Sequence, residues 1–316
     1  MADAFQTLAQ LVTLNDRNAA DYEIYDVLNR APVVASLPAV MASNGTSHKY
    51  VRDTADPATG FRAVSDGLEN TRTTTSLVTV DLAILDASFA VDIELAKAYR
   101  GGVEAYLARE TQRHLQSAFF TAEKQVFYGT GTGGSSAGFA GLANNALFDA
   151  AADSMVVNAT GSTANTGSSA WLIAFDPNYT GAAIIGGNDA NIEVGEYSVV
   201  PMAGSSTGRY PAYYVPISGH VGFQLGSQYG IVRIANLTAD SGKGLTDALI
   251  AQAIEKIPSH MRAMLRLVMN RRSQRQLQAS RTATTATGSP APFPEESFGV
   301  PVIVTDAIVS TEALLS

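Results

Sequence analysis

Residues 101–129 read GGVEAYLARETQRHLQSAFFTAEKQVFYG, and this stretch decides the fold. Its apolar side chains recur with the 3.6-residue period of a helix, at Val103, Leu107, Leu115, Phe119, Ala122 and Val126. Gly129 is a favoured residue just past the C-terminus of a helix. At ~1.5 Å per residue, a helix over 102–128 would be roughly 40 Å long, about the width of a whole domain. We therefore expect one long helix that runs across the molecule.

The stretch before this helix, residues 77–93, is predicted to be a long strand with a defect. Its apolar residues first occupy one face and then the other: Val78, Val80, Leu82 and Ile84, followed by Leu85, Ala87, Phe89, Val91 and Ile93. Successive side chains of a strand point to opposite faces, so this change of parity predicts a bend or bulge near Leu85.

Further upstream, residues 47–75 are polar and balanced in charge. Four cations stand against four anions: Lys49, Arg52, Arg62 and Arg72 against Asp53, Asp56, Asp66 and Glu69. The flanks alternate weakly around a turn near Asp56-Pro57 and Gly60, which predicts a two-stranded ribbon with little apolar burial of its own. An isolated ribbon is marginally stable in water, so it should lie on another surface. We therefore predict that these eight charged residues contact a neighbouring subunit.

The first 46 residues are predicted to form an arm. Residues 4–14 fit a short amphipathic helix, and Pro32 and Pro38 interrupt any longer element after it. Asp3 stands where a signal peptide carries Lys or Arg, and we find no apolar run of about 20 residues, so we expect a cytosolic chain without a membrane span.

Beyond the long helix, the glycine-rich residues 129–144 are expected to form a flexible loop, followed by short strands to about residue 240. A helix is predicted over 246–257, ended by Pro258. The run RAMLRLVMN, residues 262–270, looks like a strand that leads to a helix capped by Asn270. After a low-complexity loop, FGVPVIVTDAIV at 298–309 predicts a last strand.

Composition limits the function. The chain has 316 residues, 46% hydrophobic and 16% charged, with a net charge of −8. The hydrophobic fraction is that of a folded protein, and the acidic balance argues against general affinity for nucleic acid or anionic membrane. No cysteine is present, which excludes disulfides, thiolate metal sites and cysteine nucleophiles.

Catalytic motifs are weak. Gly-x-Ser-x-Gly occurs at Ser136 and Ser206, with His220 and His260 downstream, which leaves a serine hydrolase as an alternative function. Neither serine lies between a predicted strand and a predicted helix, as that motif requires. The histidines lack metal-ligand spacing. We therefore expect no catalytic residue, cofactor or metal.

Residues 262–281 contain six arginines and no acidic residue or lysine: Arg262, Arg266, Arg271, Arg272, Arg275 and Arg281. This pattern fits a nucleic-acid patch, pairing with carboxylates of a neighbouring subunit, or a solvated helix face. The absence of aromatic residues and the acidic chain disfavour nucleic acid. The planar guanidinium suits carboxylate partners, and we favour Arg271, Arg272 and Arg275 as interface residues.

The order of these elements resembles the major capsid protein of tailed bacteriophages, whose Johnson fold is shared with encapsulins. The resemblance implies an α+β fold in four parts. These are an N-terminal arm (1–46), an extended ribbon called the E-loop (47–80), a peripheral domain with a long spine helix (81–145, with strands shared with later chain) and an axial α/β domain with a return strand (146–316).

The same resemblance implies a structural protein of the virion. It would self-assemble into hexamers and pentamers of an icosahedral head that encloses double-stranded DNA, without sequence-specific binding. Its partners would be copies of itself, a portal, and separate scaffolding and decoration proteins, with assembly in the host bacterial cytoplasm and no membrane. An encapsulin-like compartment is the alternative within the fold.

Overall fold

The computed structural model describes residues 26–55, 57–67, 72, 74–130, 134–176, 181–187, 192–204, 208–283 and 290–316. The helix predicted over 4–14 lies outside these residues. Within them, no helix is both long and apolar enough to cross a bilayer.

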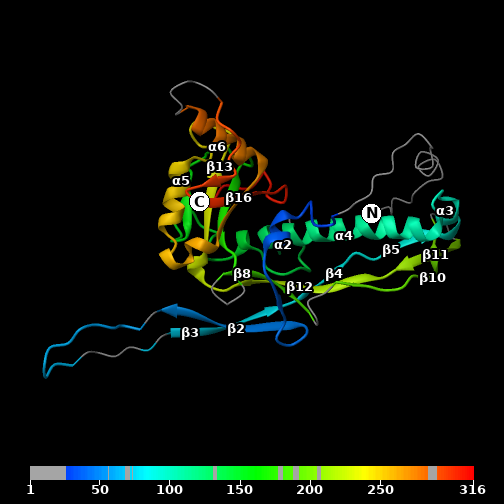
Figure 1. Cartoon of the computed structure of the whole chain (residues 1–316), viewed down its shortest axis with the longest axis horizontal. Helices are drawn as coiled ribbons and strands as arrows, with labels where there is room; N and C mark the ends of the chain where they lie inside the picture. Colours follow the sequence, from blue (N-terminus) through cyan, green and yellow to red (C-terminus); the bar gives the residue numbers. More distant parts are fainter. Residues whose placement is uncertain are drawn as a thin grey trace.

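The predicted long helix is confirmed as α4, Gly102–Tyr128, which runs along the body of the molecule (Figure 1). Leu107, Ala122 and Val126 of the predicted apolar face are buried. Gly102 has a φ of 85°, which favours glycine where the chain turns into the helix. Gly129 follows the last residue of the helix, as expected.

The single bent strand predicted over 77–93 is three strands: β3 (Thr74–Asp81), β4 (Ala83–Asp86) and β5 (Phe89–Asp92). The breaks fall at Leu82 and at Ala87-Ser88, so the predicted position near Leu85 was wrong. The second break has a local cause. Asp86 Oδ1 accepts a hydrogen bond from the Ser88 N–H at 2.8 Å, and Ser88 Oγ accepts one from the Ile217 N–H at 2.9 Å.

These three strands join three different sheets. β3 pairs with β2, β4 with β12 (Ile217–Leu225) and β5 with β11 (Arg209–Val215). β12 is also paired with β8 (Ala182–Gly186) and β9 (Glu193–Val194), and β8 with β1 (Ala39–Met41). β11 also pairs with β10 (Ser198–Ala203). The sheets that contain β4 and β5 lie alongside α4, and α3 (Ile93–Ala98) packs near its N-terminal end (Figure 1).

A six-stranded sheet holds the main core. Its order is β15 (Glu296–Ser297), β16 (Val300–Val304), β14 (Leu265–Met269), β7 (Ser168–Ala174), β13 (Ile231–Leu237) and β6 (Val156–Asn158). β7 and β13 are buried along their whole length. Trp171 of β7 packs against Phe127 of α4 and Phe148, which joins this core to the C-terminal end of the long helix.

Two helices complete this part of the molecule. α5, Asp247–Glu255, begins after Thr246, whose side chain accepts a hydrogen bond from the Leu249 N–H, and ends before Pro258. α6, Arg271–Ala283, is capped by Asn270, whose Oδ1 accepts a hydrogen bond from the Ser273 N–H at 2.8 Å. Both helices were predicted. The strand predicted over 262–270 starts only at Leu265, because Ser259–Met264 form a 3-10 turn.

The predicted ribbon is confirmed. β2 (Ser47–Ala55) and β3 form an antiparallel pair that projects beyond the rest of the molecule (Figure 1). Its base is held more firmly than a ribbon without a core would be, because Tyr50 and His48 are buried. The Tyr50 hydroxyl donates a hydrogen bond of 2.6 Å to the carbonyl oxygen of Leu225 in β12.

Candidate subunit-contact surfaces

The ribbon exposes apolar side chains that were not predicted as contact residues, because the prediction rested on the charged residues. Phe61 and Val64 in the loop that joins its strands are fully exposed, at 107% and 96%. On the ribbon itself Val51 lies directly opposite Leu77, and these side chains are 56% and 67% exposed. Such a set of exposed apolar groups is typical of a contact surface, because the subunit itself does not cover it.

The charged residues predicted at this interface lie along the same ribbon. Lys49, Arg62, Asp66 and Arg72 are exposed, and Arg52 is half-buried at the base. The side chain of Asp53 and all of Asp56 and Glu69 lie outside the described residues. Arg62 Nη1 donates a hydrogen bond of 3.2 Å to the backbone oxygen of Asp66. Between the ribbon side chains that the structure describes, no ion pair forms, so these charges are available to a neighbouring molecule.

The three arginines of α6 have different roles. Arg271 forms an exposed ion pair with Asp306 at 2.7 Å, and Arg275 is exposed. Arg272 instead points into the subunit, where its Nη2 donates to the carbonyl oxygens of Thr166 and Leu237 at 2.8 and 3.0 Å. Burial lowers the pKa of Arg272. Its guanidinium therefore ties α6 to β13, and charge reversal at Arg272 would disturb the fold as well as any interface.

Arg281, another of the six arginines in residues 262–281, also forms its contacts within the subunit. Arg281 donates two hydrogen bonds of 2.7 Å to the carboxylate of Asp247, in the two-pronged geometry of a strong pair. The hydrogen bond lowers the pKa of Asp247 and raises that of Arg281. This pair joins α6 to the N-terminus of α5. No local pattern in the sequence indicates this pair, because 34 residues separate the partners.

A buried carboxylate holds the segment that leads into the ribbon. Glu123 of α4 is fully buried, and its Oε2 accepts hydrogen bonds from the N–H groups of Val33 and Val34 at 2.8 and 3.1 Å. Both belong to the short helix α2, Pro32–Ser36. Its Oε1 accepts a hydrogen bond from the hydroxyl of Thr305, just after β16. Burial raises the pKa of Glu123. One side chain thus joins α2, the long helix and the C-terminal segment.

The glycine-rich loop after α4 is bound to the helix end, although we predicted a flexible loop. Gln125 Nε2 donates to the carbonyl oxygens of Ser135 and Phe139 at 2.9 and 2.8 Å, and its Oε1 accepts from the Ser135 N–H at 2.9 Å. A Cβ at Gly138 would lie 2.1 Å from Gln125 Nε2, so the close approach needs glycine.

The hydrolase alternative gains no support from this geometry. Ser136 is exposed on the loop that follows a helix, whereas the nucleophile motif needs a turn from strand to helix. Ser206 lies outside the described residues. His220 is on β12, and His260 is in the turn Ser259–Met264. Within the described ranges, no group of three His, Asp or Glu side chains is placed to hold a metal ion.

Comparisons with known proteins agree with the capsid interpretation. The family model described as major capsid protein GP7 matches residues 16–316. A chain of the bacteriophage Epsilon15 structure superposes with a TM-score of 0.68 at 16% identity, covering 100% of this chain and 98% of that one. A chain of the bacteriophage JBD30 capsid gives 0.51 at 10% identity, with 96% and 99% covered. No curated protein sequence matches the chain.

The encapsulin alternative has weaker support. A chain of the encapsulin complex from Synechococcus elongatus gives a TM-score of 0.45 at 9% identity, covering 72% of this chain and 95% of that one, which is too remote to carry an argument. The structural likenesses show the fold, which is the α+β Johnson fold. The family match spans almost all of the sequence. The chain belongs to the major capsid protein GP7 family and is a structural protein of a tailed-bacteriophage capsid.

Proposed function

We propose that copies of this chain associate into hexamers and pentamers, which close into an icosahedral head around double-stranded DNA. The observation that carries the proposal is the projecting ribbon with fully exposed Phe61 and Val64 in its loop. The ribbon leaves the body at its base, so the body of the same subunit does not cover that loop (Figure 1). The surface that buries it belongs to another copy.

The expected free energies indicate that the apolar side chains contribute more to this contact than the charged ones. Burying one large apolar side chain contributes roughly 1.5–3 kcal/mol, whereas an exposed ion pair contributes about 0–1 kcal/mol. The four apolar side chains of the ribbon therefore outweigh the charges that we first predicted to make the contact. Association itself costs on the order of 4–15 kcal/mol, which is similar in size to what the four side chains contribute, so a stable shell needs further contacts besides the ribbon.

The shape also supports rings. A ribbon at one end of a subunit and a receiving surface elsewhere make a head-to-tail contact, in which different patches of identical copies meet. Such contacts generate closed rings when the rotation between copies permits. Rings of five and six copies are the units that an icosahedral shell requires.

We further propose the four-part division of the chain: arm 1–46, E-loop 47–80, peripheral domain 81–145, which shares strands with later chain, and axial domain 146–316, from which those strands come. Pairing of β8 and β12 with β1 and β4, and of β11 with β5, supports placing residues 182–225 with the peripheral domain. The six-stranded sheet with α5 and α6 would be the axial domain. In this scheme β16 returns the chain to the end of α4, where Thr305 meets Glu123.

The remaining parts of the proposal concern partners and location. A portal, a separate scaffolding protein and decoration proteins would accompany the shell, which would assemble in the host cytoplasm. The net charge of −8 supports the proposal that the shell encloses DNA without strong general attraction between the protein and the phosphate backbone. We assign the chain no catalytic role, cofactor or metal.

Deletion of residues 52–72 tests the proposal. Val51 and Leu77 are paired, so residues 73–76 remain to close a short turn between them. We expect a folded, soluble subunit that forms no rings or shells by negative-stain electron microscopy. The double variant Phe61→Ser with Val64→Ser should reproduce the loss with every charge retained. Normal particles from both variants would contradict the proposal.

A further inference from the structure

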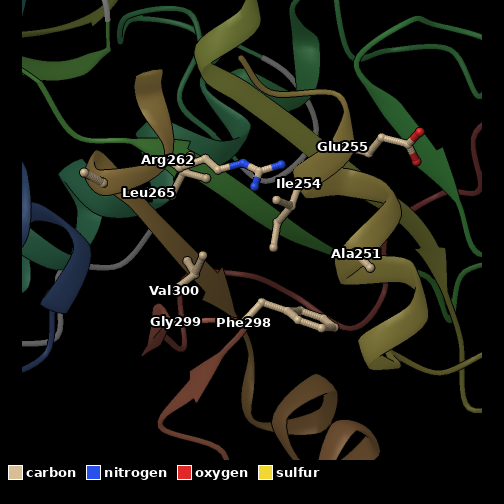
Figure 2. A pocket seen from close by; sticks show the side chains of 9 residues that line it. Ala251, Ile254, Glu255, Arg262, Leu265, Phe298, Gly299 and Val300 are labelled. Carbon is tan, nitrogen blue, oxygen red and sulfur yellow. The ribbon is translucent and has the colours of Figure 1, made fainter. Parts of the chain in front are cut away.

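An apolar groove lies on the outer side of the six-stranded sheet, between α5, the turn Ser259–Met264 and the hairpin formed by β15 and β16 (Figure 2). Its volume is about 510 Å³. Ile254, Leu265 and Val300 form a buried apolar floor. α5 lies at the edge of this part of the molecule, on the side away from the long helix α4 (Figure 1).

The hairpin beside the groove presents an aromatic side chain in an unfavourable backbone conformation. Phe298 and Gly299 have φ values of 51° and 76°, as in a two-residue turn that favours Asn-Gly. A bulky residue with positive φ destabilises the folded chain, because its Cβ lies too close to the following carbonyl oxygen. Phe298 is nevertheless 64% exposed, so burial within the subunit offsets little of this cost. A strained and exposed aromatic residue indicates a role outside the subunit.

Arg262 supplies the cation of the groove. It is exposed, and Figure 2 shows its side chain extending across the groove towards Ile254. Its guanidinium forms no hydrogen bond or ion pair with any residue that the structure describes. An arginine and an aromatic side chain around a desolvated apolar floor is the composition of an interface hot spot.

We infer that this groove binds a second copy of the chain, through a segment that carries a carboxylate beside an apolar side chain. The inference rests on the proposed function, and charge complementarity favours this occupant. The segment 262–281 has six of the 21 basic residues, and the rest of the chain has 15 against 29 acidic residues, a net charge of −14. A second copy therefore offers mostly carboxylates to Arg262.

Nucleic acid fits the groove poorly. Arg262 is the one cation among the residues that line it, and Glu255 stands on the opposite wall. A phosphate backbone needs several cations to bind. The apolar floor also has nothing to offer a phosphate. The groove is thus a second contact between subunits, separate from the ribbon. It lies on the side of the six-stranded sheet that is away from α4.

Two substitutions test the inference in the full chain. Phe298→Gly removes the strain, so the melting temperature of the subunit should stay or rise, while the concentration needed for assembly should rise about tenfold or more. Arg262→Glu should weaken assembly similarly, and Arg262→Lys less. Arg209→Glu, the same charge change at an exposed site on β11, is the control and should assemble as the wild type does. Wild-type assembly by Phe298→Gly and Arg262→Glu, or an equal loss in the control, would overturn the inference.

A labelling experiment gives an independent readout. The chain has no cysteine, so Ala251→Cys places a single thiol on the wall of the groove. Maleimide should modify this thiol about tenfold or more faster in free subunits than in assembled shells. Equal rates in both would overturn the inference and leave the proposed function intact. Protection of free subunits by added DNA would also overturn it, and a wild-type chain that stays monomeric when concentrated with a crowding agent would contradict both.

Discussion

The guanidinium of Arg233 lies 3.0 Å from the carboxylate of Glu312 inside the body of the subunit, and both side chains are buried. Arg233 also donates to Ser169 Oγ at 2.9 Å and to the carbonyl oxygen of Phe148 at 2.8 Å, and it stacks over the ring of Trp171. Tyr128 donates its hydroxyl to the other oxygen of Glu312, and burial raises the pKa of this tyrosine. The C-terminal segment is thereby fixed to β13 and to the end of α4.

Breaking this pair should destabilise the subunit strongly. Arg233→Met leaves the carboxylate of Glu312 buried without its cation, which typically costs about 3–5 kcal/mol of unfolding free energy. The double variant Arg233→Met with Glu312→Leu should recover much of that loss, because no unpaired charge remains. Urea denaturation of unassembled subunits measures both. As a control, Arg271→Met breaks the exposed pair with Asp306 and should change stability by only about 0–1 kcal/mol.

Glu123 should make stability depend on pH. Burial raises its pKa above the value in the unfolded chain, so the folded subunit keeps the proton at pH values where the unfolded chain has released it. The stability that this group contributes is therefore full below the unfolded pKa of about 4.3 and falls as pH rises through the folded-state pKa. Glu123→Gln should match or exceed the wild type at pH 7.

The difference between Glu123→Gln and the wild type should shrink as pH falls towards about 4.3, which denaturation curves across this range will measure. Glu123→Ala should be less stable than either, by about 1–3 kcal/mol for each buried donor left unsatisfied at Val33, Val34 and Thr305. An advantage of Glu123→Gln over the wild type that grows in acid would contradict the assigned direction of the pKa.

The glycine-rich loop should not tolerate a methyl group at its contact with α4. Gly138→Ala would push against Gln125 Nε2 and disturb its three hydrogen bonds, so we expect a loss of about 1–3 kcal/mol. Gly67→Ala is the matched control, since nothing lies within 4 Å of a Cβ there. Thermal melting of the two variants compares them, and equal melting temperatures would show that the loop readjusts without cost.

Substitutions of the α6 arginines should have different effects, depending on whether the side chain is exposed or points into the subunit. Arg271→Glu with Arg275→Glu should weaken subunit association and leave the far-UV circular dichroism native, because both side chains are exposed. Arg272→Met should instead lower stability by about 1–3 kcal/mol, since the carbonyl oxygens of Thr166 and Leu237 lose their donor. Sedimentation velocity reads the first effect and urea denaturation the second. Native assembly by the exposed pair would indicate a solvated helix face.

Local signals in the sequence were sufficient for α4, α5 and α6. The 3.6-residue period and Gly129 placed α4, Pro258 marked the end of α5, and Asn270 placed the start of α6. The split of the strand before α4 could not be predicted in the same way. Its breaks are set by pairing with β11 and β12, which follow more than a hundred residues later in the chain.

The contact surfaces were predicted in part for a similar reason. The ribbon was located correctly, but the contact was assigned to its charged residues and not to Phe61 and Val64. These two are isolated apolar residues in a polar loop, and the sequence shows them as such. The inward orientation of Arg272 depends on Thr166, which is 106 residues away and comes near only in the folded chain. Phe298 gave no signal, because the sign of φ at a turn is not apparent from a lone Phe-Gly pair.

The bond between Arg233 and Glu312 also has a consequence during synthesis. Seventy-nine residues separate the partners, so at about 5–20 residues per second the ribosome delivers Glu312 several seconds or more after Arg233. Until then the guanidinium has no carboxylate partner with which it can be buried in the core. A nascent subunit therefore stays incompletely packed while it is translated, and Glu312 closes the core only after nearly all of this sequence has left the ribosome.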